Sequence, residues 1–261
     1  MIPALVTVPA KYEPPSVADF WQPLVGEGAW AFTRPTLEFI VVGIVLAVGM
    51  LVLTRRLTLV PSKGQFFTES AYTFIRNGVG RDIIGPRDFL RWVPLLFALF
   101  LTILLNNLMG VVPVAQYPTM SRFGFDVALS LVVYVIYQGV AIRHRGVFGY
   151  LKSLVPPGLP KAVVPLIFVL EFITYFVTRP LTLALRLFGN MFAGHLILLL
   201  FSTGGEYLLL HSSGPVRGVG VISYLLYVVM FVFEILVEVL QAYVFVLLTA
   251  LYIGGSLADE H

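Results

Sequence analysis

The sequence contains no cysteine, and only 12% of its 261 residues are charged. Without cysteine the chain can form no disulfide framework, no thiolate metal site and no covalent haem attachment. It also has neither the glycine-rich loop that binds phosphate nor the His-Glu-x-x-His pair of zinc proteases. We therefore expect no cofactor and no metal, and we expect that the chain by itself is not an enzyme.

Hydrophobic residues, by contrast, make up 58% of the chain, and the mean hydropathy is +0.91. Soluble domains contain about 45–50% apolar and about 25% charged residues. The composition therefore predicts an integral membrane protein. The net charge of +3 is small and the basic residues cluster in loops, which argues against a nucleic-acid partner.

The N-terminal residues 1–34 predict an irregular segment outside the membrane, and residues 35–261 predict a single transmembrane helical domain. Five prolines in the stretch Met1–Val25 break any helix there. The stretch has no basic start followed by an apolar core, so it is neither a secretory signal nor an arginine-rich transit peptide. Trp21 and Trp30 suit a membrane interface.

The apolar runs predict an all-α membrane protein with five crossing helices, over residues 35–54, 89–113, 125–142, 163–203 and 221–253. The last two would be roughly 60 Å and 50 Å long as helices, well beyond the hydrocarbon core of about 30 Å. We therefore expect both to lie strongly tilted, with a break near Pro180 as the alternative for the first. Arg143-His144-Arg145 should close the third span.

Residues 62–80 predict a helix of another kind. One helical face is mostly apolar, with Phe66, Phe67, Ser70, Ala71, Phe74 and Ile75. The opposite face is polar, with Lys63, Glu69, Thr73, Arg76 and Asn77. This pattern is typical of an amphipathic helix that lies in the membrane interface.

The distribution of lysine and arginine predicts the orientation. The 55–91 loop carries seven such residues and the 143–161 loop carries four, whereas the 114–124 and 204–220 loops carry one each. Because basic loops stay in the cytoplasm, the N-terminus should lie outside and the C-terminus in the cytoplasm.

Several ionisable and amide side chains interrupt the apolar segments. They are Glu38, Asp126, Glu171, Arg179, Arg186, His195, Glu234 and Glu238, together with Asn106, Asn107, Asn190 and Gln241. Charges inside a membrane segment usually face the interior of a helix bundle or an aqueous cavity. The sequence therefore predicts a polar path through the bundle.

Helical spacing sorts these groups into faces. At 100° per residue, Glu234, Glu238 and Gln241 share one stripe of the last helix. One stripe of the preceding helix holds Arg179, Arg186, Asn190 and Ala193. His195 is nine residues from Arg186 and points to the opposite side.

The two faces predict two roles. Arg186 cannot release its proton, so it is a fixed charge. His195 and the carboxylates can titrate, and they should line an aqueous path from outside. We expect Arg186 to face a carboxylate of another chain, since an arginine and a carboxylate at 4 Å attract by about 4 kcal/mol at an effective dielectric of 20.

Two blocks of sequence carry a resemblance. Arg186-Leu-Phe-Gly-Asn190-Met-Phe-Ala-Gly and Leu240-Gln241-Ala242-Tyr243-Val-Phe-Val-Leu-Leu-Thr-Ala-Leu-Tyr252 resemble the signature of the a subunit of F-type ATP synthases. The similarity covers most of the chain from about Pro61 onward. It implies a non-catalytic stator of the bacterial plasma membrane that passes protons through two half-channels to and from a c-ring. The implied partners are the c-ring proteolipids, b-type subunits of the peripheral stalk, other ATP synthase subunits and membrane lipid.

The resemblance also implies roles for single residues. Arg186 matches the stator arginine, and Asn190 and Gln241 match its polar neighbours. His195 and Glu234 look like an exchanged pair, since bacterial members often carry Glu at the first position and His at the second, and mitochondrial members carry the exchanged pair. The other acidic residues expected on the proton path are Asp126, Glu171 and Glu238.

Other interpretations stay open at this point. A self-contained, ion-coupled secondary transporter is one, although no second copy of residues 180–195 is found. A membrane scaffold with incidental charges is another. The structural alternatives for single residues are an ion pair of Arg186 with Glu234 or Glu238, a core imidazole at His195, a helix N-cap at Asp126 and an anchor of Arg179 on Glu171 or lipid headgroups.

Overall fold

The protein is almost entirely helical in the computed structural model, which describes residues 12, 14–16, 23–26, 31–55, 58, 61–112, 119–155, 158–160 and 162–258. The described strands are short: β1 (Pro23–Val25) pairs antiparallel with β2 (Phe32–Thr33). Most of the segment 1–34, including Trp21 and Trp30, lies outside the described residues.

Within this described part, five helical stretches are long and apolar enough to cross a membrane. They are α1 (Arg34–Arg55), α3 (Phe89–Met109), α4 (Phe123–Ser153), the continuous stretch Val164–His211 and α7 (Pro215–Leu257). The prediction of an all-α membrane protein with five crossing helices is therefore confirmed.

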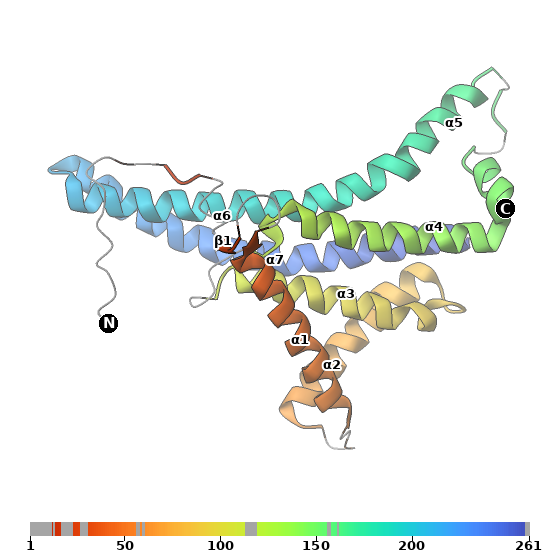
Figure 1. Cartoon of the computed structure of the whole chain (residues 1–261), viewed down its shortest axis with the longest axis horizontal. Coiled ribbons are helices and arrows are strands. Elements are labelled where there is room, and N and C mark those ends of the chain that lie inside the picture. Colours follow the sequence, from red (N-terminus) through yellow and green to blue (C-terminus); the bar gives the residue numbers. More distant parts are fainter. Residues whose placement is uncertain are drawn as a thin grey trace.

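The last two helices are longer than the sequence predicts. The stretch Val164–His211 has 48 residues and α7 has 43, which at 1.5 Å per residue gives lengths of about 70 Å and 65 Å. Figure 1 shows residues 179–211 of the first stretch beside α7 along the long axis of the molecule, while residues 164–173 bend away and α1 runs steeply downward from the middle. Helices of this length cannot stand upright in a core of about 30 Å, so both lie strongly tilted if α1 crosses the membrane.

The chain does not end a helix at Pro180. Instead, α5 (Val164–Ile173) continues through the π-helical segment η5 (Thr174–Thr178) into α6 (Arg179–His211), and the axis bends there (Figure 1). A proline has no N–H for the helical ladder, and its ring crowds the carbonyl four residues earlier. A wider π turn before Pro180 accommodates both effects without a break.

The predicted interfacial helix consists of α2 (Lys63–Phe74) and the π-helical continuation η3 (Ile75–Ile84). Phe66 and Phe67 are exposed by 58% and 73%, so they face away from the protein, as a lipid-facing surface requires. Ile75, which the sequence assigns to the same face, is instead fully buried. The reason is that η3 turns toward the bundle and packs against α3 and α7.

The third span also continues beyond its predicted end. α4 passes Arg143-His144-Arg145 and reaches Ser153, with a kink at Gly146 (φ 71°, ψ 166°). A left-handed φ is tolerated by glycine because it has no Cβ. After the kink, the last part of α4 turns upward to the side where α5 begins in Figure 1.

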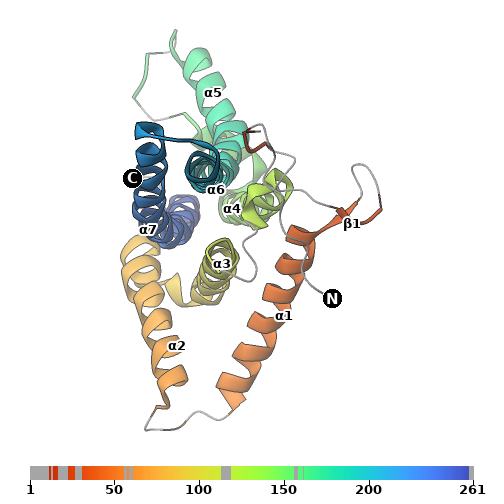
Figure 2. The same ribbon diagram turned by 90° about the vertical axis from the view of Figure 1, so that its left-hand side faces the viewer.

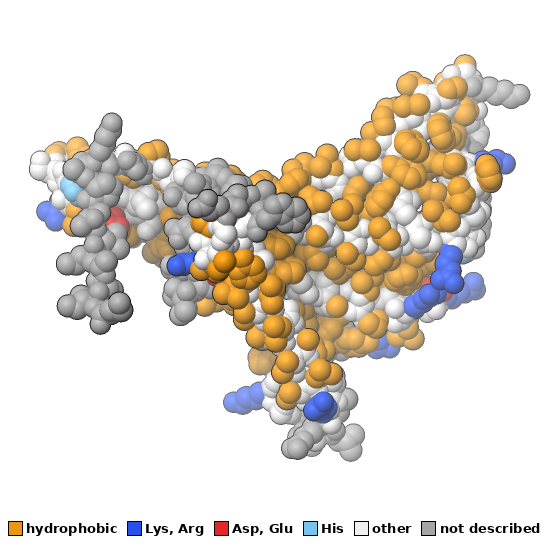
Figure 3. All heavy atoms as spheres, in the orientation of Figure 1, with side chains coloured by type: hydrophobic (Ala, Val, Ile, Leu, Met, Phe, Trp, Pro, Cys, Tyr) orange, Lys and Arg blue, Asp and Glu red, His pale blue; other side chains and the backbone are white. Residues whose placement is uncertain are grey.

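The core lies where α3, α4, α6 and α7 meet, around Leu96, Ile103, Leu187 and Phe245. α1 stands at the edge of this bundle (Figure 2), and its buried residues are Pro35 and Val42. The space-filling view shows hydrophobic side chains along α1, α4 and α5 (Figure 3), the surface expected for contact with lipid tails.

Candidate functional site

α6 has two faces of different character. Arg186, Asn190 and Ala193 are exposed, whereas Leu187, Met191 and His195 are buried. His195 follows Arg186 by nine residues, which is half a turn out of phase. One helix therefore carries a permanent cation outward and a titratable ring inward.

Arg186 lies near the middle of the 48-residue helical stretch. Among the described side chains it forms no ion pair with an acid, and Glu234 and Glu238 are buried on the inner side of the helix pair. An arginine in a membrane segment costs at least about 2.5 kcal/mol, so it requires water or a partner. The structural alternative of an ion pair within the chain therefore finds no support in the described part.

Three titratable groups meet on the inner side. His195, Glu234 and Glu238 are exposed by 6%, 5% and 2%, and their ligand atoms lie within 4.8 Å of one another. His195 Nδ1 is 3.4 Å from Glu234 Oε1. By chemistry and spacing these three groups could share protons or hold a cation.

The hydrogen bond of the imidazole defines its tautomer. Nδ1 lies 3.0 Å from the carbonyl oxygen of Met191, one turn earlier. A carbonyl can only accept, so Nδ1 carries a hydrogen, and in the neutral ring Nε2 then carries the lone pair. In the neutral form of His195, Nε2 is therefore the nitrogen that can accept a proton.

Several polar atoms of this cluster are buried without a hydrogen-bond partner among the described residues. They are His195 Nε2, Glu234 Oε1, both carboxylate oxygens of Glu238, and Gln241 Nε2. Buried polar atoms are normally hydrogen-bonded, and exceptions concentrate where protons, water or ions are handled. The concentration of such atoms here distinguishes the cluster from ordinary packing.

Two amide side chains connect the cluster to its surroundings. Asn190 Nδ2 donates to Gln241 Oε1 at 2.7 Å, which joins the outer face of α6 to the acidic stripe of α7. Asn107 Nδ2 donates to the backbone oxygen of Glu238 at 3.2 Å and ties α3 to α7. Asn106, by contrast, bonds to Thr102 of its own helix.

The other two predicted acids, Asp126 and Glu171, are not in the group of side chains whose ligand atoms meet here. Asp126 is fully buried near the start of α4, but the N-cap of that helix is Arg122, so Asp126 is not the cap. Glu171 lies 24 residues before His195 on the same continuous helix, a separation of about 36 Å along its axis.

Arg179 lies among aromatic rings. Its Cζ is 3.5 Å from the centroid of the Tyr175 ring and 5.0 Å from that of Tyr252. The hydroxyl of Tyr137 donates to the backbone oxygen of Tyr175 at 2.7 Å and holds this turn in place. Arg179 is thus anchored by cation–π contacts rather than on Glu171. The spacing of four between Tyr175 and Arg179 is the sequence signal for this contact.

Two glycines for which the sequence suggests no particular role lie against the cluster. A Cβ at Gly194 would collide with the carboxylate of Glu234, and a Cβ at Gly110 would collide with the His195 ring. Gly194 is the last residue of the block that begins at Arg186, but only the packing of α3 and α7 on α6 shows why no larger side chain fits at either position.

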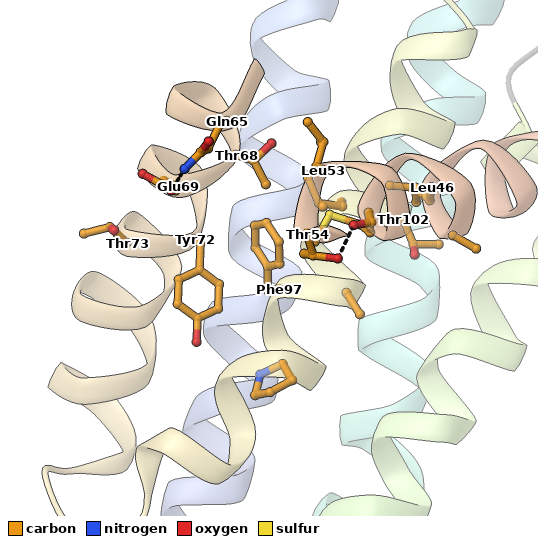
Figure 4. Close-up of a pocket in the computed structure, with 15 residues that line it drawn as sticks. Leu46, Leu53, Thr54, Gln65, Thr68, Glu69, Tyr72, Thr73, Phe97 and Thr102 are labelled. Atoms are coloured by element: carbon orange, nitrogen blue, oxygen red, sulfur yellow. Dashed lines mark hydrogen bonds between the residues drawn. The ribbon is translucent and has the colours of Figure 1, made fainter. Parts of the chain in front are cut away.

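A separate cavity of about 740 Å³ opens between α1, α2 and α3 (Figure 4). Gln65 and Glu69 of α2 line it, with Gln65 Nε2 donating to Glu69 Oε1 at 2.7 Å, opposite apolar residues of α1 and α3. None of its lining residues belongs to α6 or α7, so it is distinct from the acidic cluster.

Comparison with known proteins gives one consistent family. A family model described as the ATP synthase A chain matches residues 36–254. A protein of Nocardioides sp. (strain JS614) named ATP synthase subunit a is 45% identical, over 96% of this chain and 95% of its own length. Proteins of the same name from Streptomyces lividans and Rhodococcus erythropolis are 38% and 34% identical, over 88% and 96% of this chain and 81% and 93% of their own lengths. Because these matches cover nearly the whole sequence, the chain belongs to the ATP synthase A chain family, that of the bacterial F-type ATP synthase a subunits.

Proposed function

We propose that the chain is a non-catalytic stator that passes protons through two half-channels to and from a rotating c-ring, and so couples the proton gradient to ATP synthesis. Its family membership already gives it a part in ATP synthesis and proton transport as a multi-pass protein of the bacterial plasma membrane. One observation carries the finer proposal: α6 turns Arg186 outward and His195 inward, onto two buried carboxylates.

The outward face acts as the electrostatic barrier. Arg186 stays positive at any physiological pH, so it keeps an approaching ring carboxylate deprotonated. The attraction is about 4 kcal/mol at 4 Å and an effective dielectric of 20. This attraction makes the ring carboxylate release its proton before it passes Arg186, and it blocks direct flow between the half-channels.

The inward face acts as the proton relay. His195, Glu234 and Glu238 are close enough to exchange protons, and the hydrogen bond between Asn190 and Gln241 extends from this cluster toward the outer face. Each charge that crosses 100 mV releases about 2.3 kcal/mol, which drives the rotation. Asp126 and Glu171, which lie apart from the cluster, are proposed to serve separate stretches of the proton path.

Charge distribution supports the proposed orientation, with the N-terminus outside and the C-terminus in the cytoplasm. Lysine and arginine gather at the tip formed by α1 and α2 and at the end of the molecule near the C-terminus of α7 (Figure 3). These are the regions that the positive-inside rule assigns to the cytoplasm. The proposed partners are the c-ring, b-type subunits of the peripheral stalk and the other ATP synthase subunits.

The test is an Arg186→Ala complex in inverted membrane vesicles. We expect proton-driven ATP synthesis to fall to background, because nothing then separates the half-channels. Arg217→Ala is the matched control, since Arg217 is also an exposed arginine but lies at the start of α7, away from the cluster. An Arg186→Ala complex that makes ATP with normal coupling would overturn the proposal, as would a chain that purifies without a ring of small proteolipid subunits.

A further inference from the structure

The two nitrogens of His195 have different surroundings. Nδ1–H donates to the carbonyl of Met191 and lies beside Glu234 Oε1. Nε2 is buried and has no hydrogen-bond partner among the described residues. It lies against Gly110, at the C-terminal end of α3.

Gly110 is not required by its backbone conformation. It has φ −62° and ψ −30°, and its N–H bonds to the carbonyl of Asn107 at 2.9 Å, as in an ordinary helical turn. Alanine adopts these angles without strain. In such a conformation alanine normally stabilises a chain relative to glycine, by restricting the unfolded state.

Space is what requires glycine here. A Cβ at Gly110 would lie 2.7 Å from Cε1 of His195 and nearer still to Nε2. Both distances are far below a van der Waals contact, so either the ring or the end of α3 would have to move. The imidazole is the more mobile of the two, because rotation about its side-chain bonds leaves the helix intact.

We propose that Gly110 is a positioning residue for proton transfer at His195. This inference rests on the function proposed above. The bare Cα of Gly110 lets the ring lie with Nδ1 toward Glu234 and Nε2 toward the end of α3.

The proton balance of the step is simple. Nε2 takes up one proton and the ring becomes an imidazolium with a hydrogen on each nitrogen. The Nδ1–H bond then breaks and its proton bonds to Glu234 Oε1, so the ring is neutral again and one proton has moved. The neutral ring then carries its hydrogen on Nε2, so the resting tautomer returns when Nδ1 takes up a proton and Nε2 releases one.

The first test compares Gly110→Ala with Gly139→Ala in the assembled complex. Gly139 is an exposed helical glycine of α4, and a Cβ added there would meet no atom within 4 Å. Gly139→Ala therefore controls for the lower backbone entropy of alanine without adding a steric contact. We expect Gly110→Ala to assemble normally and to lower passive proton flux in vesicles about tenfold or more, since small misplacements of reacting groups cost large factors in rate. Normal flux in Gly110→Ala would overturn the inference.

A double-mutant cycle separates positioning from a structural role. In a His195→Ala background the ring is gone, and we expect Gly110→Ala to lower the flux no further. An equal loss with and without the ring would mean that Gly110 acts through the helix end, and would overturn the inference. If His195→Ala itself leaves proton flux and coupling unchanged, the relay in the proposed function is wrong, whatever Gly110 does. This outcome is therefore distinguishable from a failure of the inference about Gly110 alone.

A spectroscopic readout covers the case in which His195→Ala removes all measurable flux. Nitrogen NMR of complexes labelled at histidine, with His195→Ala as the difference reference, reports which ring nitrogen carries hydrogen. We expect the Nδ1–H form in the native complex and in Gly139→Ala, and a shifted signal in Gly110→Ala. An unchanged signal in Gly110→Ala would contradict the positioning role.

Discussion

On α6 the face that carries Arg186 is exposed, whereas the face that carries His195 is buried against α7 and the end of α3. The outer cation has no acidic partner among the described side chains, while the inner ring has two carboxylates within reach. A charge that faces outward in a membrane segment needs a partner from elsewhere. Titratable groups that face one another need none, because they can share their protons. The difference between the faces therefore divides the helix into a part that acts on another chain and a part that acts within this one.

The largest expected effect comes from Arg186→Lys, which keeps the charge but replaces the guanidinium. We expect proton-driven ATP synthesis to be lost, because an ammonium cannot form the planar two-point contact with a carboxylate and can lose its proton when desolvated. Arg217→Lys is the control, and ATP synthesis in inverted vesicles is the measurement. Normal synthesis in Arg186→Lys would show that any cation suffices on this face.

Glu234→Gln tests the inner face. Glutamine has the same shape but cannot take up a proton, so we expect passive proton flux to fall about a hundredfold, the usual contribution of a positioned proton carrier, while the complex still assembles. Glu206→Gln is the matched control, because Glu206 is an exposed glutamate on α6. Flux at the native rate in Glu234→Gln vesicles would remove Glu234 from the path.

Gly194→Ala tests how closely the two helices of the inner face must approach. The new methyl group would collide with the carboxylate of Glu234, which can swing away from His195 at little cost in stability. We expect flux to fall about tenfold with normal assembly, since the reacting atoms separate. Gly218→Ala on α7 is the control, because its Cβ would meet no atom within 4 Å. Equal flux in the two variants would show that the contact of His195 with Glu234 is not used.

Hydropathy predicts the number and type of helices well, and their ends poorly. The first span differs from α1 by one residue at each end, but the predicted 221–253 helix extends to Pro215–Leu257. Hydropathy indicates whether a residue prefers lipid or water. Helix ends and kinks depend instead on residues that leave the helical conformation, such as Gly214 and Gly146 with their positive φ angles. A tilted helix can therefore continue through polar residues such as Arg217 without any apolar signal.

Helical spacing likewise predicts which residues share a face, but not which faces meet. It assigns Glu234, Glu238 and Gln241 to one stripe, and all three are buried together. The contact of that stripe with His195 depends on how far α7 slides along α6, which small residues at the crossing decide. Gly220 is one of them, since a Cβ there would collide with Leu209. The sequence gives no pairing rule for such contacts, so the cluster appears only in three dimensions.

The smallest expected effect comes from Tyr175→Leu. Tyr175 lies in η5, outside both the Arg186 face and the His195 face of α6. The ring of Tyr175 stacks under Arg179 at 3.5 Å, and cation–π contacts contribute about 0.5–2 kcal/mol depending on their desolvation. We expect a lower midpoint of thermal unfolding in detergent with proton flux near the native rate. Tyr175→Phe is the matched control, because it keeps the aromatic face and loses only the hydroxyl. If Tyr175→Leu instead abolished flux, the π-helical turn before Arg179 would belong to the proton path. The functional difference between the two faces of α6 would then extend into η5.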